Sequence, residues 1–358
     1  MEFNQQFYYF RGRVALAEIL KAADVKQGDL VAIQGFTCTA VLESLLAVGA
    51  KPVFIDIDRN TLSMSIISLK EKAQSNKLKA VVIQHTFGIN ANIKNINSFA
   101  KSNGIFSIED SCHRIEPTYT ESGELLCDAC FFSYEWGKPM PAGLGGSAII
   151  KNLQHKEVLQ KNFQNFSSPS IFTEINILSQ KIIFKYLYSP KTFWILKIIS
   201  EKLKFIRKSN YNNLDYVSNE FNTSFSKVSK FFLEREFKNN ILAEIKELNI
   251  ESLSKIIPTN FFAETIANNK EKLHRYPIFL VNKGLVVKKS AKCNIELSSW
   301  YNTPVHPLNE RELLRYGYEK EELPNAEWAC KHVVNISLSK NFSSDYLKRL
   351  SLFLEENT

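Results

Sequence analysis

Asp110 and Lys138 have the residue types and positions that suit cofactor chemistry. Asp110 ends an apolar run at residues 105–110, and Lys138 follows a second run at residues 129–134. Because the carboxyl ends of parallel strands meet at one edge of a sheet, we expect these side chains to lie side by side. Pyridoxal phosphate needs a lysine that holds it as a Schiff base and a carboxylate that keeps its ring nitrogen protonated. Taken singly, Asp110 also suits a strand-end cap, and Lys138 a solvated turn lysine.

The phosphate of such a cofactor needs hydrogen-bond donors, and four further residues offer them. Gly12 stands at the start of the first expected helix, where free amides and the helix dipole favour an anion, and Arg13 adds a positive charge there. Ser133 and Thr37 each bring a hydroxyl after an expected strand. A turn role for Gly12 and a structural role for the nearby His113 are the alternatives.

Two periodicities alternate over the first 150 residues and predict the elements that position these side chains. Helical spacing occurs at residues 14–23, 39–48, 66–73 and 93–100. Short apolar or β-branched runs, typical of strands, lie at residues 30–34, 52–56, 80–85, 105–110, 129–134 and 146–150. Alternation of this kind predicts an α/β fold, with a mainly parallel sheet between two layers of helices.

The rest of the chain predicts a helical insertion and a smaller domain. Residues of about 160–210 form a Phe- and Ile-rich, basic helical insertion, and a connecting helix is expected at residues 224–248. Strands at residues 274–280 and 333–338 and a helix at 346–355 complete a smaller α+β domain. We expect a large cofactor-binding domain at residues 1–223 and a C-terminal domain at residues 224–358.

Composition excludes several classes of protein. The chain has 358 residues, of which 44% are hydrophobic and 23% charged, so a packed interior is expected. The net charge is +8, but residues 171–208 hold eight basic residues against two glutamates, which disfavours a nucleic-acid groove across the body. Six scattered Cys predict reduced thiols, and we expect no metal site, although Cys127 and Cys130 form a CxxC. The absence of a long apolar stretch or signal peptide favours the cytoplasm.

The order and spacing of several motifs resemble one known family. The matching segments are RGRVALAEIL, QGDLVAIQGFTCTAV, AVGAKPVFIDIDRNTLSM, VVIQHTFG, SIEDSCH and CDACFFSYEWGKPMPAGLGGSAII. They resemble the nucleotide-sugar aminotransferases of the DegT/StrS type, closely over residues 11–150 and loosely over residues 215–358. The resemblance implies the aspartate aminotransferase fold, which is fold type I of the pyridoxal-phosphate enzymes.

The resemblance also implies a role for each site residue. Lys138 would form the Schiff base and shuttle the proton, Asp110 would pair with the ring nitrogen, and His113 would lie near the ring hydroxyl. Ser133 would bind the phosphate together with the amides of Gly12 and Arg13. Thr37 and Cys38 would lie beside the cofactor, and Asn222 would reach the phosphate of a neighbouring subunit in a homodimer.

Several positions depart from the family pattern. Arg11, Gly12 and Arg13 stand where the family has Ser-Gly-Thr, and Cys38 replaces the aromatic residue that stacks on the cofactor ring. Thr223 and Ser224 follow Asn222 in place of Tyr-Arg. The related dehydratases have a histidine at the position of Lys138, so this lysine favours transamination. Further along the chain, Trp300, Tyr301 and His306 suit either the substrate side of the site or a structural role.

These features predict an enzyme that moves an amino group from glutamate or glutamine to a keto-sugar nucleotide. The pathway expected is the synthesis of sugars for cell-surface polysaccharide or lipopolysaccharide, such as O-antigen. The alternative is a catalytically inactive member of the family that binds sugar nucleotides as a scaffold.

The basic insertion has two interpretations. Residues 171–208 interleave apolar and aromatic side chains with lysines, a pattern typical of a helix at a membrane interface. Such a contact would be weak and peripheral, at the inner membrane face. The other interpretation is that these helices pack on the subunit core or at the dimer interface, with the lysines on the wet face.

Overall fold

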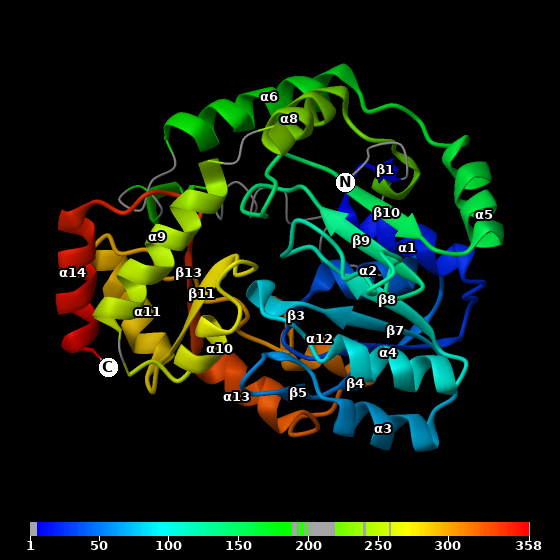
Figure 1. Ribbon diagram of the computed structural model, residues 1–358, viewed down its shortest axis with the longest axis horizontal. Coiled ribbons are helices and arrows are strands. Elements are labelled where there is room, and N and C mark those ends of the chain that lie inside the picture. The colour runs from blue at the N-terminus through cyan, green and yellow to red at the C-terminus, as the bar shows by residue number, and fades with distance from the viewer. Residues whose placement is uncertain are drawn as a thin grey trace.

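A seven-stranded sheet forms the centre of the large body in the computed structural model (Figure 1). The structure describes residues 6–187, 192, 194–196, 198, 199, 219–238, 241–257 and 259–357. The strands, in spatial order, are β1 (Phe7–Tyr9), β10 (Gly146–Ile150), β9 (Ala129–Ser133), β8 (Phe106–Asp110), β7 (Leu78–Gln84), β2 (Leu30–Gln34) and β4 (Lys51–Ile55). Strands β4, β2, β7, β8 and β9 run parallel, while β10 and β1 extend the sheet antiparallel. The expected mainly parallel sheet is therefore present.

Helices cover both faces of this sheet. The five helices of the N-terminal part are α1 (Gly12–Ala22), α2 (Thr39–Ala47), α3 (Ile66–Ser75), α4 (Ile93–Ser102) and α5 (Leu153–Phe163). Successive residues of β2 show the two layers, because Val31 and Ile33 belong to the core cluster that contains α1 and α2, whereas Ala32 packs with α3 and α4. Buried on both faces, the strands read as continuous apolar runs, which is why the sequence identified them.

A second, smaller sheet lies at the other side of the molecule. It pairs β11 (Arg275–Phe279) with β13 (Val333–Ser337) in antiparallel register. The helices of this part are α9 (Ile241–Ile256), α10 (Ala263–Ala267), α11 (Lys283–Lys292), α12 (Glu310–Leu314), α13 (Pro324–His332) and α14 (Ser344–Glu355). Short elements complete the described structure: β3 (Thr37–Cys38), β5 (Ile57–Asp58), β6 (Ser63–Met64), β12 (Val305–His306) and the 3₁₀ turns η2 (Thr86–Gly88) and η4 (Asn219–Asn222).

The segment between the two parts contributes the helix pair α6 (Ile171–Tyr186) and α8 (Lys227–Lys238), seen at the top of Figure 1. Glu174 of α6 joins the two, since its carboxylate accepts hydrogen bonds from the Lys227 and Val228 amides at the start of α8. Leu233 of α8 packs with Phe132 and Tyr134 of the large body. The domain division at residues 1–223 and 224–358 stays a prediction.

The described part of the basic insertion is its first half. Lys191, Lys197, Lys202, Lys204, Arg207 and Lys208 lie outside the described residues. Within the described residues, α6 leaves large apolar side chains exposed, among them Phe172 (80%) and Tyr186 (70%). None of the described helices combines the length and hydropathy needed to cross a membrane.

Candidate active site

Most of the residues singled out from the sequence converge at the carboxyl ends of the parallel strands. A cavity of about 310 Å³ opens there between the sheet, the start of α1 and the segment around Tyr301. Its lining includes Gly12, Arg13, Cys38, Asp110, His113, Ser133 and Lys138. Strand β8 delivers Asp110 and β9 delivers Ser133, and the loop after β9 delivers Lys138. The expected neighbourhood of Asp110 and Lys138 is thus what the fold produces.

Asp110 presents a buried carboxylate to this cavity. Its side chain is 5% exposed, and Oδ1 accepts a hydrogen bond of 2.9 Å from the Cys112 amide. Burial raises the pKa of Asp110, while the Cys112 hydrogen bonds and the charge of Lys138 oppose that rise. A cationic group bound in the cavity would therefore be stabilised by this carboxylate.

The preceding residue, Glu109, faces a different environment. Its carboxylate accepts hydrogen bonds from the Thr118 amide and hydroxyl and pairs with Nε2 of His85 at 3.0 Å. Burial would raise the pKa of Glu109, but the His85 and Thr118 hydrogen bonds and the nearby Arg114 bring it below its ordinary value. Glu109 is thus committed to an internal network, and Asp110 alone of this pair lines the cavity.

His113 and Lys138 form a direct contact whose proton can be assigned. The Phe87 amide donates a hydrogen bond of 3.1 Å to Nδ1 of His113. A neutral imidazole whose Nδ1 accepts carries its proton on Nε2, so the Nε2 hydrogen faces Nζ of Lys138, 3.1 Å away, and can be donated to that amine only when the amine is neutral. Burial, with the positive charges of Lys138 and Arg275 and the neighbouring His274, holds the pKa of His113 well below its ordinary value. His113 is therefore a neutral donor aimed into the site.

Glycines allow the backbone to close around the other end of the cavity. A Cβ at Gly12 would lie 3.0 Å from Cβ of Ser133, and one at Gly146 would lie 2.4 Å from the Gly12 nitrogen. The first turn of α1 therefore approaches the end of β9 closely. The first amides of a helix have no intrahelical acceptor, so they and the Ser133 hydroxyl form a donor set for an anion.

Two arginines flank this donor set, and each is ion-paired. Arg11 contacts Glu135 at 2.7 Å and Glu220 at 2.8 Å. Arg13, whose side chain is also part of the cavity lining, pairs with Glu43. Burial and the Arg11 and Arg13 charges act in opposite directions on Glu135, and the net effect lowers its pKa. Carboxyl groups therefore hold both guanidinium groups in place beside the helix terminus.

Thr37 and Asn222 are placed differently from the other predicted residues. Thr37 is buried, but its hydroxyl donates to Oε1 of Gln84 at 2.6 Å, and it does not line the cavity. Asn222 lies in η4 with an exposed side chain, outside the cavity of its own chain. The proposed reach of Asn222 into a neighbouring subunit stays a prediction.

Comparison with known proteins identifies the family. The model of the DegT/DnrJ/EryC1/StrS aminotransferase family matches residues 11–175, which include every strand of the large sheet except β1 and most of the cavity lining. Over residues 11–175 the chain is therefore similar to this family. The family predicted from the sequence motifs is thereby confirmed.

Two relatives in this family differ in how much of the chain they match. An uncharacterized protein of Methanocaldococcus jannaschii is 25% identical over 341 residues, which cover 91% of this chain and 78% of that protein. GDP-perosamine synthase of Escherichia coli O157:H7 is 31% identical over 144 residues, 39% of each chain. The chain therefore matches about two-fifths of the length of this named enzyme.

A solved structure extends the likeness to the whole fold. NtdA of Bacillus subtilis, with its bound cofactor PMP, has a TM-score of 0.68 and 15% identity, covering 98% of this chain and 72% of that one. The aspartate aminotransferase-like fold expected from the sequence is confirmed. Together with the family, this likeness supports the predicted enzyme class and cofactor.

Several of the residues that line the cavity were not identified as site residues from the sequence. Gln84 lines the cavity at the end of β7, and Glu135 enters it one residue beyond the buried Tyr134. Gln84 lies near the end of the strand expected at residues 80–85, and Glu135 directly follows the one expected at residues 129–134, so their position was the available signal. Tyr301 and His306 also line the cavity, whereas Trp300 packs under the Arg275 guanidinium at 4.1 Å. Tyr301 thus brings an aromatic ring to the cavity in which Cys38 replaces the family's stacking residue.

Proposed function

We propose that the chain is a pyridoxal-phosphate-dependent aminotransferase that moves an amino group from glutamate or glutamine to a keto-sugar nucleotide. One observation carries the proposal: Lys138 and Asp110 line the same cavity, whose far end is a glycine-built donor set. The lysine, the carboxylate and the anion cradle match the three needs of this cofactor, which are a covalent anchor, a partner for the ring nitrogen and a phosphate site.

We assign a separate role to each residue of the site. The cofactor supplies an electron sink for the carbon that gains or loses the amino group. Lys138 anchors the cofactor and then moves a proton with its amine. Asp110 would pair with the protonated ring nitrogen, and the buried setting would strengthen that interaction. His113 donates its Nε2 hydrogen toward the ring side of the cavity and orients the lysine amine, because it contacts Nζ directly.

The phosphate would lie at the first turn of α1. The amides of Gly12 and Arg13, the Ser133 hydroxyl and the Arg13 guanidinium are the donors available there. Glu43 pairs with Arg13, and this pairing keeps the guanidinium oriented along the cavity wall. A charged donor at this place would compensate for the hydroxyl that the Ser-Gly-Thr pattern supplies elsewhere in the family.

The substrate class rests on the relatives. One is a GDP-perosamine synthase, and another, from Pseudomonas aeruginosa, is a UDP-2-acetamido-2-deoxy-3-oxo-D-glucuronate aminotransferase. Their names support a keto-sugar nucleotide as amino acceptor for this chain as well. We propose a cytoplasmic role in making sugars for surface polysaccharide or lipopolysaccharide, with glutamate or glutamine as amino donor.

The deciding experiment separates this enzyme from a non-catalytic scaffold. Purified protein supplied with pyridoxal phosphate should show a visible absorbance band, and Lys138→Ala should lose it. Incubation with glutamate and a panel of keto-sugar nucleotides, followed by mass spectrometry, should yield an amino sugar with the wild-type protein only. A protein that binds sugar nucleotides but never develops the band would be a scaffold.

A further inference from the structure

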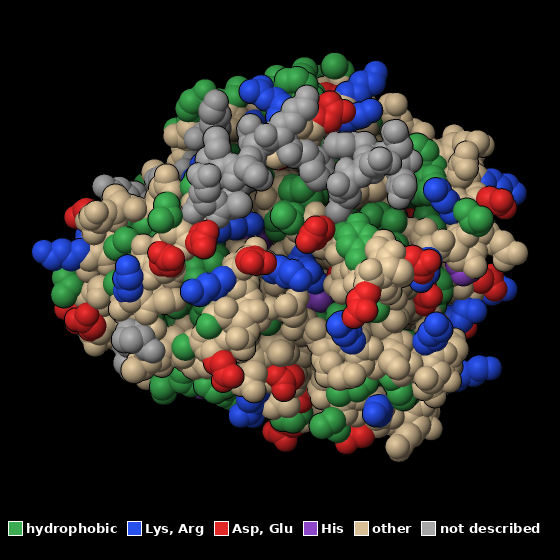
Figure 2. Space-filling view, in the orientation of Figure 1, with side chains coloured by type: hydrophobic (Ala, Val, Ile, Leu, Met, Phe, Trp, Pro, Cys, Tyr) green, Lys and Arg blue, Asp and Glu red, His purple; other side chains and the backbone are tan. Residues whose placement is uncertain are grey.

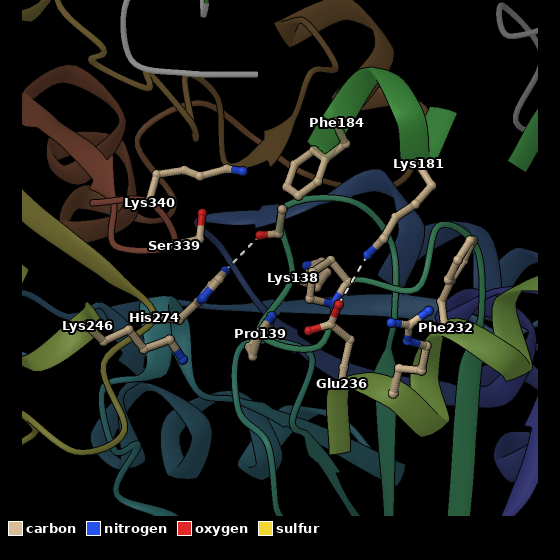
Figure 3. A pocket seen from close by; sticks show the side chains of 13 residues that line it. Lys138, Pro139, Lys181, Phe184, Phe232, Glu236, Lys246, His274, Ser339 and Lys340 are labelled. Atoms are coloured by element: carbon tan, nitrogen blue, oxygen red, sulfur yellow. Dashed lines mark hydrogen bonds and ion pairs between the residues drawn. The ribbon is translucent and has the colours of Figure 1, made fainter. Parts of the chain in front are cut away.

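A second cavity adjoins the first at Lys138. It has a volume of about 350 Å³ and lies between the helix pair α6 and α8, the start of α9 and the turn after β13 (Figure 3). Lys138 lines both cavities, so whatever fills the second one sits beside the reactive amine. The helical insertion thus contributes a wall to the active site.

The second cavity is strongly basic. Apart from Lys138, its lining contains four cations: Lys181, Arg235, Lys246 and Lys340. Glu236 is the one carboxylate among the described lining residues, and it pairs with Lys181 at 3.1 Å. Positive charge therefore exceeds negative charge in a partly enclosed space, where screening by water is weaker than on the surface.

Among these cations, Lys246 lies in the environment that least favours its charged form. Burial lowers its pKa to about 8, and no ion pair to its ammonium occurs among the described residues. Its neighbour His274 supplies no negative charge to balance the ammonium, and burial with the Lys246 and Arg275 charges holds the pKa of His274 well below its ordinary value, so that the imidazole is neutral. The neutral His274 instead donates from Nε2 to the Gly137 carbonyl at 2.7 Å, next to Lys138. A bound anion would relieve the cost of burying Lys246.

Aromatic rings hold two of the other ammonium groups along the walls. Lys340 lies 5.2 Å from the ring centre of Phe184, and Lys181 lies 5.1 Å from that of Phe232. In Figure 3 the Lys181 side chain extends toward Glu236, and Lys340 extends alongside Phe184. Cation–π contacts of this kind limit the freedom of lysine side chains, so the charges are positioned before a ligand arrives.

We propose that this second cavity binds the diphosphate group of the acceptor substrate, through Lys246, Lys340 and Arg235. The proposal rests on the proposed function and assigns part of that substrate to named residues of the helical segment. A diphosphate ester suits the excess of cations better than glutamate does, since the ammonium group of glutamate offsets one of its carboxylates. The position beside Lys138 would place the attached sugar at the reactive amine.

Calorimetric titration of the cofactor-loaded enzyme with inorganic pyrophosphate tests this assignment. Loading fills the phosphate site at α1, so the remaining pyrophosphate site is the one measured. Lys246→Met and Lys340→Met should each weaken pyrophosphate binding about tenfold, as expected for the loss of a charge-assisted contact. Lys101→Met, at an exposed lysine of α4, should leave the affinity unchanged.

Glu236→Gln is expected to have the opposite effect on pyrophosphate binding. Removal of the carboxylate should tighten pyrophosphate binding several-fold at low salt, whereas a merely structural role of Glu236 would weaken it. Glutarate, titrated in parallel, carries the two carboxylates of the amino donor without its ammonium group, and should still bind more weakly than the more highly charged pyrophosphate. The assignment is overturned if wild-type enzyme does not bind pyrophosphate at low salt, if Lys246→Met behaves like Lys101→Met, or if glutarate binds more tightly.

The cofactor band keeps this test separate from that of the proposed function. If the band is present and pyrophosphate fails to bind, only the diphosphate assignment falls. If the band never forms while pyrophosphate binds with the expected variant pattern, the aminotransferase proposal falls and an anion site remains. A wild-type band in each variant also shows that the variant is folded.

Discussion

Nε2 of His113 lies 3.1 Å from Nζ of Lys138, and the Phe87 amide determines that His113 carries its hydrogen on Nε2. Because Nδ1 of His113 is occupied as an acceptor, the hydrogen on Nε2 points at the lysine amine. The contact joins the end of the β8 segment to the loop after β9, so the geometry of the reactive amine depends on two neighbouring strands. The predictions below concern the groups arranged around this contact.

The first prediction concerns the carboxylate beside the cofactor ring. Asp110→Asn should retain cofactor binding but lose roughly a hundredfold or more in kcat, because a neutral amide stabilises a cationic ring nitrogen poorly in a buried site. Absorbance titration and steady-state kinetics measure the two effects. Glu109→Gln is the control, since Glu109 serves an internal network: it should lower the unfolding temperature and leave kcat near the wild-type value. Normal turnover in Asp110→Asn would contradict the assignment.

The second prediction concerns the pH dependence of stability. The pKa of His274 is held well below that of an unfolded-state histidine, about 6.5. As the pH falls below that value, the unfolded chain takes up a proton that folded His274 does not, so its contribution is present above about pH 6.5 and lost below it. The loss should approach about 1.4 kcal/mol per pH unit.

Urea unfolding of cofactor-free wild-type protein and His274→Gln measures this effect. The free energy of unfolding of the wild type, relative to the variant, should decrease as the pH is lowered from 7.5 to 5.5. The glutamine retains a donor for the Gly137 carbonyl, so the comparison isolates the titration of the imidazole. If the difference in free energy of unfolding between the wild type and His274→Gln does not change with pH, His274 has the same pKa in the folded and unfolded states.

The third prediction concerns the assembly. If Asn222 completes the phosphate site of a neighbouring subunit, the active species is a dimer. Asn222→Ala and Lys138→Ala should each be impaired alone. After subunit exchange, their mixture should recover about a quarter of wild-type sites, because half of the dimers are hybrids with one intact site. A fully active monomer in analytical ultracentrifugation, or a mixture without recovery, would refute shared sites.

The fourth prediction concerns the outer face of α6, where a weak peripheral membrane contact is proposed. The protein should co-sediment with anionic but not zwitterionic vesicles, in a salt-sensitive way, since each basic residue near an anionic surface contributes about 1 kcal/mol. Phe172→Glu and Tyr186→Glu should reduce recovery, while Ile67→Glu should not, although Ile67 of α3 is 68% exposed. Equal recovery in the supernatant with both vesicle types would favour the interpretation that α6 packs within the assembly.

The elements of the large body were predictable from local patterns because its strands are buried on both faces. Strand β2 was predicted within the same bounds, residues 30–34, as was β10, and the four N-terminal helices differ from their predicted ranges by at most two residues at either end. Strand β1 was not predicted, since three residues are too short for a periodic signal and its pairing with β10 is a long-range contact. The single connecting helix expected at residues 224–248 is instead two helices, α8 and α9.

The sequence by itself indicated the family resemblance, the fold class and the grouping of the candidate site residues, because Asp110 and Ser133 end strands and Lys138 follows one, and these strand ends lie at one edge of the sheet. The sequence could not indicate which hydrogen-bond partners each of these side chains would have. Only the tertiary structure shows that Glu109 is engaged in an internal hydrogen-bond network, whereas Asp110 faces the cavity. It also shows that the Thr37 hydroxyl donates to Gln84 and that His113 carries its proton on Nε2. Lys181 is the clearest case: its sequence neighbourhood indicates a solvated basic helix, yet the packing of α6 on α8 places its ammonium between Glu236 and Phe232 in a cavity wall. Contacts between elements far apart in the chain depend on the packing of whole surfaces, which local residue patterns do not encode.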